Sequence, residues 1–158
     1  MADRKKDYDA VIATPLGRLG INAAAALTNI DFVSARIPLK KARTPVARKA
    51  YTQLKAYFAD SRTHFDLPLA AAGSDFQQRV WRALRQIPSG TARNYGELAK
   101  RLKSAPRAVG GACRANPIPI VVPCHRVVAA NGLGGFMGAT RGRAMDIKRW
   151  LLKHEAAG

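Results

Sequence analysis

The sequence predicts two parts of different build. The first is an α/β N-terminal subdomain made of a small antiparallel sheet and a helix, and the second is a mainly α C-terminal subdomain with a winged-helix-like helix-turn-helix. Short apolar runs separated by turn residues fill the chain before residue 67, and capped helical patterns follow residue 73. A connector bounded by proline and glycine, residues 67–73, lies between them. We therefore expect subdomains at residues 1–72 and 73–158.

The N-terminal part reads as a hairpin, a third strand and a helix. Apolar runs over residues 8–13 and 19–24 flank the turn sequence Thr14-Pro15-Leu16-Gly17. Residues 30–37 can supply another strand, and Pro45 opens a helical pattern that runs to about Ala59. None of these residues has a catalytic pattern, so the predicted role of this part is to support the second half.

The C-terminal part reads as a series of short helices. Capping-box patterns at residues 74–77 and 94–97 each open a helix. Pro106 stands where a first helical residue is expected, and a helix over residues 107–115 follows. Two short helices joined by a tight turn are the helix-turn-helix plan, whose second helix enters a DNA groove. The last helix is predicted to begin near Ala144.

The charge balance indicates a polyanionic partner. Lys and Arg number 27 against 10 for Asp and Glu, which gives a net charge of +17 over 158 residues. Nucleic acid is the first candidate and an acidic membrane surface the second. An apolar fraction of 47% argues against a disordered chain.

Targeting and metal signals are not found. No apolar run approaches the ~20 residues that span a bilayer, and residues 1–8 lack the apolar stretch of a signal peptide. Cys113 and Cys124 do not form a disulfide framework, so we expect a cytoplasmic protein with reduced thiols. The three histidines are scattered without zinc spacing, and we expect neither a metal nor a cofactor.

One predicted helix carries two adjacent glycines. Gly110 and Gly111 each cost about 1 kcal/mol relative to alanine in a helix interior. One interpretation is close packing against a neighbouring helix. The other is that the helix backbone lies against a sugar-phosphate backbone, in a minor groove, with Arg107 at its start and Arg114 at its end.

The most informative segment is residues 116–126, NPIPIVVPCHR. Its three prolines predict an extended, rigid path, and its aliphatic residues lead into the core. Cys124 is followed at once by His125 and Arg126, and a thiol beside cationic groups has a lowered pKa and is a strong nucleophile. The alternative is a buried structural cysteine.

A carboxylate on the last helix is a candidate partner for His125. Ile147, Leu151 and Glu155 fall at i, i+4 and i+8, which is one helical face. Glu155 either lies near the helix end and is solvated, or points inward and reaches His125, fixing its tautomer and making it more basic.

A glycine-rich loop, residues 132–138, precedes that helix. It lacks the order of a phosphate-binding loop. It is either a flexible wall over a pocket, to which Phe136 and Met137 offer a flat surface, or only a connector. A thiol, an imidazole and a carboxylate together also suit a cysteine hydrolase. Such an enzyme requires neither a charge of +17 nor a helix made smooth by glycine.

The segment from Asn116 to Val127 resembles the active-site motif of the O6-alkylguanine-DNA alkyltransferases, also called methylated-DNA–protein-cysteine methyltransferases. The resemblance covers nearly all of residues 74–155, in order, and includes FQQRVW (76–81), IPSG (87–90), YGELA (95–99), RAVGGA (107–112) and KRWLLKHE (148–155). The N-terminal part is similar only in outline.

The resemblance implies DNA repair by direct damage reversal. The alkyl group on guanine O6, with O4-alkylthymine as a second candidate substrate, moves once and irreversibly to Cys124 after the base is flipped out from the minor-groove side of the duplex. His125 would draw the thiol proton through a water, Glu155 would orient His125, and Asn116 would brace the turn. The protein would be a monomeric, single-turnover enzyme that inactivates itself.

The resemblance also implies the binding residues. Tyr95 matches a tyrosine that helps to rotate the nucleotide and donates to the guanine, and Arg107 matches the arginine that fills the gap in the stack. The expected substrate pocket comprises Tyr95, Arg114, Val127, Phe136 and Met137, and the expected DNA surface comprises Arg107, Ala108, Gly110, Gly111 and Tyr95.

The chain departs from the family pattern in three places. The turn between Lys103 and Arg107 is shorter, Phe136 stands where many relatives have tyrosine, and extra residues at 139–146 include Arg141 and Arg143. A non-catalytic protein that recognises alkylated DNA is the second hypothesis, but relatives of that type lack the cysteine that is present here at position 124.

Overall fold

The computed structural model describes residues 6–158, so most of the charged start of the chain, which was interpreted above as lacking a signal peptide, lies outside the described residues. The chain forms two compact units, one ending at Ala72 and the other beginning at Gly73. Within the described residues, none of the helices combines the length and the apolar character needed to cross a bilayer.

The first unit is built on a three-stranded antiparallel sheet in the order β1-β2-β3. Strands β1 (Ala10–Thr14) and β2 (Gly17–Ala23) form the predicted hairpin. Strand β3 (Leu27–Val33) begins and ends earlier than the predicted residues 30–37. The chain turns where the strand was expected to continue, because the Ile37 N–H donates to the Ser34 carbonyl at 3.0 Å.

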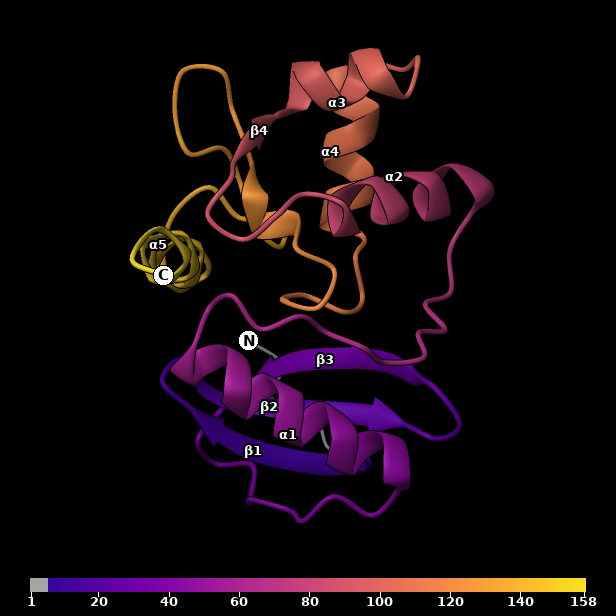
Figure 1. Ribbon diagram of the computed structural model, residues 1–158, viewed down its shortest axis with the longest axis vertical. Coiled ribbons are helices and arrows are strands. Elements are labelled where there is room, and N and C mark those ends of the chain that lie inside the picture. The colour runs from indigo at the N-terminus through magenta and orange to yellow at the C-terminus, as the bar shows by residue number, and fades with distance from the viewer. Residues whose placement is uncertain (1–5) are drawn as a thin grey trace. The chain divides into compact units, whose positions relative to one another are not determined.

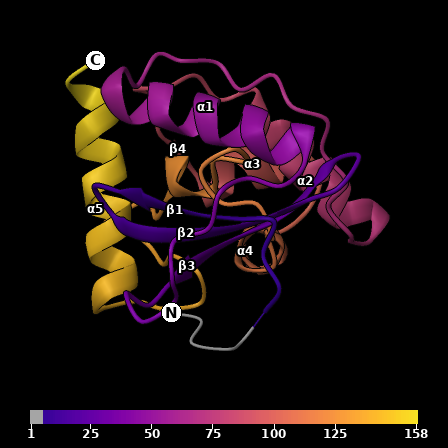
Figure 2. The same ribbon diagram turned by 90° about the horizontal axis from the view of Figure 1, so that it is seen from below.

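Helix α1 (Pro45–Ala59) covers one face of this sheet (Figure 1 and Figure 2). The Thr44 hydroxyl accepts the Ala47 N–H at 3.0 Å and so caps the helix. The buried face of α1 consists of Ala47, Ala50, Leu54 and Tyr57, spaced as one helical stripe. The predicted helix is confirmed at both ends.

The second unit is mainly helical, as predicted. It contains α2 (Asp75–Arg85), α3 (Tyr95–Arg101), α4 (Pro106–Arg114) and α5 (Arg143–Ala156). Helix α4 packs against both α3 and α2 (Figure 1). The buried Trp81 indole of α2 donates to the Ala112 carbonyl of α4 at 2.8 Å. The pair α3–α4, joined by a short turn, is the expected helix-turn-helix.

A short parallel ladder connects two distant stretches of this unit. Strand β4 (Arg93–Asn94) pairs with β5 (Val127–Val128) in the register Arg93↔Val127 and Asn94↔Val128. The 3₁₀ turn η1 (Cys124–Arg126) directly precedes β5, and α3 directly follows β4. The ladder therefore brings the cysteine segment close to the start of the helix-turn-helix.

Candidate active site

The segment that leads to Cys124 is a series of turns, and the predicted extended path is wrong. The Val122 N–H donates to the Ile118 carbonyl at 2.9 Å, and Ile120 has a φ of 73°. The Asn116 side chain holds these turns, since its amide donates to the Val122 carbonyl at 2.8 Å and its oxygen accepts the Ile118 N–H at 3.0 Å. The prolines lack N–H donors, and the side-chain hydrogen bonds of Asn116 add to the few backbone ones. A left-handed β-branched residue is strained, and such strain is concentrated at functional sites.

Cys124 is 5% exposed and lines a cavity of about 190 Å³. Burial raises the pKa of its thiol, against the lowering effects of the Asn116 hydrogen bond and the Lys148 charge. The expectation of a lowered pKa was therefore wrong. The two cationic neighbours invoked for it are engaged elsewhere: His125 is neutral, and Arg126 is bound to a carboxylate.

His125 and Glu155 form a buried pair. The Nε2 atom of His125 lies 2.8 Å from Oε2 of Glu155, and the two side chains are 0% and 1% exposed. Glu155 thus points inward, as in the second of the two alternatives. Burial lowers the pKa of His125, although Glu155 acts to raise it. The expectation that His125 is more basic than usual was wrong because desolvation of the ring outweighs the carboxylate.

The neutral imidazole of His125 can act as a proton acceptor. With Nε2–H donating to Glu155, Nδ1 carries a lone pair. Within residues 6–158 no protein group makes a hydrogen bond with Nδ1, although this atom is buried. His125 can therefore accept a proton at Nδ1 while Glu155 compensates the positive charge that develops on the ring.

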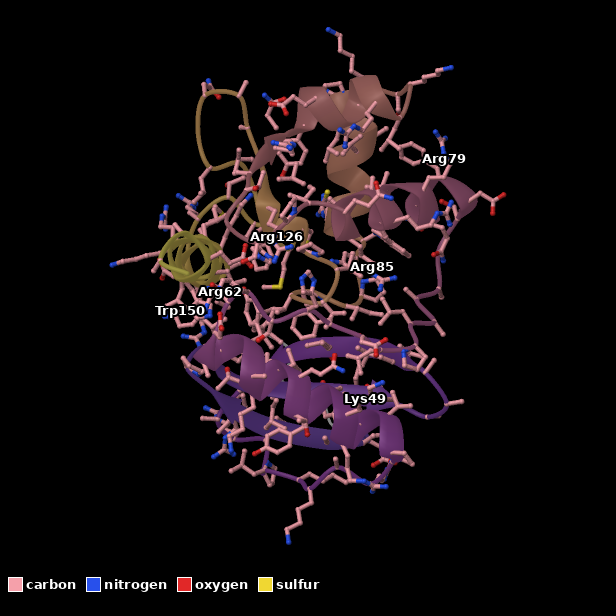
Figure 3. All side chains as sticks on the ribbon, viewed as in Figure 1. Lys49, Arg62, Arg79, Arg85, Arg126 and Trp150 are labelled. Carbon is pink, nitrogen blue, oxygen red and sulfur yellow. The ribbon has the colours of Figure 1, made fainter. Side chains whose placement is uncertain are left out.

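Arg126 belongs to the same network, although the sequence analysis did not include it among the site residues. Its Nε donates to Glu155 Oε1 at 2.8 Å and its Nη2 donates to Oε2 at 2.9 Å. Its Nη1 donates to the Ile87 carbonyl at 2.6 Å, and Figure 3 labels this side chain. This is a bidentate arginine–carboxylate pair, which fixes the carboxylate in one orientation. The presence of a charged arginine in a mostly apolar segment was the signal that could have indicated this role of Arg126.

Lys148 of α5 is the second residue that the sequence analysis missed. It is 0% exposed, and its Nζ donates to the Val127 carbonyl at 2.6 Å and to the Gly135 carbonyl at 2.8 Å. Burial lowers its pKa to about 8. Lys148 connects β5 to the cavity loop and supplies the charge that favours the Cys124 thiolate. Lys148 precedes Leu151 by three residues and Glu155 by seven, which places it beside the buried stripe of the helix, and this spacing was the available signal.

The glycine-rich loop lines the cavity, as in the wall alternative, and it ends in a tight turn. Phe136 and Ala139 exchange backbone hydrogen bonds of 2.9 and 3.0 Å. Between them Met137 and Gly138 have φ of 53° and 79°, the signs of a type I′ turn. Phe136 is buried and Met137 is 39% exposed. Both still line the cavity.

The outer face of α4 is smooth and basic. Arg107, Ala108, Gly111 and Arg114 are exposed and fall on one helical face. A Cβ atom added at Gly111 would meet nothing within 4 Å, so packing within the described protein does not explain this glycine. At Gly110 the added atom would lie 3.9 Å from the Tyr95 ring, in ordinary contact.

Apart from Arg107, Ala108 and Gly111 on the outer face of α4, the predicted residues lie in or around the cavity. Those that line the cavity with Cys124 are Tyr95, Gly110, Arg114, Phe136 and Met137, joined by Cys113. Asn116 holds the turns before Cys124, and His125 and Glu155 form the buried pair; all three lie outside the lining. Val127 does not line the cavity, and its carbonyl instead accepts from Lys148. Among the described residues, no group of three or more His, Cys, Asp or Glu side chains could hold a metal ion.

This arrangement defines a class of protein in which a buried thiol with an imidazole–carboxylate pair lies beside the second helix of a helix-turn-helix. Residues 75–157 match the family model of the 6-O-methylguanine DNA methyltransferase DNA-binding domain. The chain is 40% identical to a methylated-DNA–protein-cysteine methyltransferase of Methanosarcina acetivorans, over 95% of this chain and 99% of that protein.

Solved structures agree. The crystal structure of Mycobacterium tuberculosis O6-methylguanine methyltransferase matches with a TM-score of 0.77 at 38% identity, over 93% of this chain and 91% of that one. The Mycobacterium tuberculosis protein in complex with DNA matches with a TM-score of 0.76 at 39% identity, with the same coverage. The chain belongs to the methylated-DNA–protein-cysteine methyltransferase family.

Proposed function

We propose that this protein repairs DNA by moving the alkyl group of O6-alkylguanine in a duplex to its own Cys124. The observation that carries the proposal is that the Cys124 thiol lines a cavity together with Tyr95 and residues of α4, while the neutral His125 of the same turn is paired with Glu155 of α5. A hydrolase site has no use for a cavity wall formed by a helix-turn-helix. A non-catalytic protein that only recognises alkylated DNA requires neither the thiol nor its proton acceptor.

The reaction is a displacement at carbon. Cys124 gives its proton to Nδ1 of His125, through a water, and the thiolate attacks the alkyl carbon. The carbon–O6 bond breaks, its electron pair stays on the guanine, and a proton restores the neutral base. Glu155 compensates the imidazolium that forms, and Asn116 holds the turn that carries the sulfur. The thioether product is stable, so each molecule acts once.

Tyr95 is suited to donate to the guanine. Burial raises the pKa of its phenol to about 12, with the two cysteines adding to the effect, so the hydroxyl keeps its proton. A donor at the base stabilises the negative charge that develops on the leaving group. The flipped base would lie between Tyr95, Arg114, Phe136 and Met137.

The exposed face of α4 is the proposed minor-groove surface. Gly111 and Ala108 allow close approach of the backbone, Gly110 borders the cavity, and Arg107 would fill the gap that the flipped base leaves. The net charge of +17 favours the phosphates of any duplex, so selectivity for the lesion has to come from the cavity.

The remaining assignments follow from the same site. The second unit would bind DNA and accept the alkyl group, and the first would support it. One chain supplies the thiol, the proton acceptor and the basic helix, which suits a monomer. Both cysteines are free thiols, which suits a reducing compartment such as the cytoplasm.

Titration with a duplex that carries a single O6-methylguanine tests the proposal. The duplex is present in excess, and the unmodified guanine that is restored is counted per protein molecule. We expect one lesion repaired for each protein molecule and then no further repair. Continued turnover, or tight binding without any repair, would contradict the proposal.

A further inference from the structure

The first unit carries a groove that the proposed repair reaction does not use. Its volume is about 580 Å³, and it lies between β1, the segment after β3 and α1. The residues that line it are Val11, Ile12, Ala13, Leu39, Lys40, Lys41, Ala42, Arg48 and Tyr51.

The groove contains an open position on the edge strand of the sheet. The outer edge of β1 is covered as far as Val11, which exchanges backbone hydrogen bonds of 3.0 Å with Lys40. Hydrogen-bonding directions alternate along an antiparallel strand, so the N–H and C=O of Ala13 point to the same outer side as those of Val11. In the part of the chain that the structure describes, no group pairs with Ala13 on that side. An unpaired edge position is a template for an added strand.

The walls of the groove combine apolar surface with positive charge. Leu39 and Tyr51 are 55% and 40% exposed, which is unusual for large apolar side chains. Lys41 and Arg48 are exposed, and their charged groups have no hydrogen-bond or ion-pair partner within residues 6–158. Lys40, in contrast, is paired with Asp7 at 3.1 Å.

The open edge position and the basic, apolar walls favour one kind of ligand for the groove. An outward N–H and C=O on one extended residue are matched by the backbone of another polypeptide, and nucleic acid has no such pair of groups. A second copy of this chain, at +17, is repelled by a basic groove. We propose that the groove binds an extended acidic segment of a partner protein, which pairs with Ala13 and places an apolar side chain between Leu39 and Tyr51.

The test is fluorescence anisotropy of the full chain with a labelled short peptide of alternating Asp and Leu residues. Ala13→Pro removes the outward N–H, and the sheet keeps its hydrogen bonds because that group does not pair with β2. We expect binding at moderate salt, and a loss of about tenfold in affinity for Ala13→Pro, as for one lost hydrogen-bonded position. Melting temperature and alkyl transfer by this variant should stay unchanged.

Two matched charge-reversal variants distinguish specific binding in the groove from non-specific electrostatic attraction of the peptide. Arg48→Glu and Lys49→Glu change the same charge at neighbouring exposed positions of α1, and only Arg48 lines the groove (Figure 3 labels Lys49). The expected result is a loss of about tenfold for Arg48→Glu and a change below about twofold for Lys49→Glu. This comparison also decides the question if Ala13→Pro does not fold.

Three outcomes would overturn the proposal. Equal losses for the two glutamate variants would mean non-specific charge attraction. Displacement of the peptide by an oligothymidine that depends on Arg48 but not on Lys49 would make the groove a nucleic-acid surface. Self-association in sedimentation that Leu39→Asp abolishes would make it an interface between copies of this chain.

Discussion

The Nε2 atom of His125 lies 2.8 Å from the Oε2 atom of Glu155, with both side chains buried. The same carboxylate also receives two hydrogen bonds from Arg126. Glu155 therefore stays charged whether His125 is neutral or protonated, because the guanidinium balances it in either state. When the imidazole takes the thiol proton, its positive charge lies against the Glu155 carboxylate and is balanced by the thiolate that forms.

Glu155→Gln should disrupt both functions of this carboxylate. The amide oxygen can still accept from His125, but the amide group no longer balances the Arg126 guanidinium. We expect the free energy of unfolding to fall by about 3 kcal/mol, as when one partner of a buried ion pair is removed. Alkyl transfer should slow by at least about tenfold. Urea unfolding and single-turnover kinetics measure the two effects.

Asp146→Asn is the matched control for that variant. Asp146 also lies on α5 and is exposed, with an ion pair to Arg149 at 3.2 Å. Its loss should change stability by less than about 0.5 kcal/mol and leave the transfer rate unchanged. Similar effects of the two variants would show that Glu155 acts only through general helix charge.

The pH dependence of transfer should report Cys124 and Lys148. Because burial raises the pKa of the thiol, the thiolate fraction keeps increasing with pH through the neutral range. His125, with its lowered pKa, is already neutral there and adds no step. Above pH about 8 Lys148 loses its proton and no longer favours the thiolate, so the rise should become less steep.

Single-turnover rate constants at saturating DNA, from about pH 6 to pH 9, measure this profile. In Lys148→Met the rate at neutral pH should be lower and the change of slope should disappear. A plateau already reached at pH 7 in the unsubstituted protein is the result that this account does not allow, since it would require a thiol with a low pKa.

Substitutions at Gly111 should separate stability from DNA binding. A side chain there meets open space on an exposed helix, so Gly111→Ala should raise the free energy of unfolding by up to about 1 kcal/mol. Gly111→Leu should fold equally well but bind a duplex at least about tenfold more weakly, because the longer side chain holds the backbone away from the groove.

Thermal unfolding and a duplex-binding titration check the Gly111 variants. Ala156→Leu, at an exposed position near the end of α5, is the control and should change neither quantity much. Unchanged DNA affinity in Gly111→Leu would show that α4 does not approach the duplex through this face.

Local signals in the sequence were sufficient for most of the fold. Caps and helical periodicity predicted α1 and the helix-turn-helix, and the spacing of Ile147, Leu151 and Glu155 offered an inward carboxylate as one of two alternatives. These features depend on residues near one another in the chain. Proline content misled the prediction for residues 116–123, because the turn there depends on the side chain of Asn116, which hydrogen-bonds six residues ahead.

The electrostatics of the site could not be predicted from neighbours in sequence. Arg126 follows His125 directly, yet it binds Glu155, which is distant in the chain. The charge that favours the thiolate comes from Lys148 on α5. Burial determines the direction of the pKa shift of Cys124 and of His125, and burial is a property of the folded unit.

The central claim is that Cys124 alone is the acceptor, although Cys113 lines the same cavity. Burial raises the pKa of both thiols, that of Cys113 to about 12, so at neutral pH each needs a proton acceptor to become a nucleophile. Cys124 adjoins His125 in η1, and Nδ1 of that imidazole can take its proton. The most direct measurement is peptide mass spectrometry after incubation with a duplex that contains O6-methylguanine. We expect one methyl group on the Cys124 peptide, none on the Cys113 peptide, and full transfer by Cys113→Ser. A methyl group on Cys113, or transfer that persists in Cys124→Ala, would contradict it.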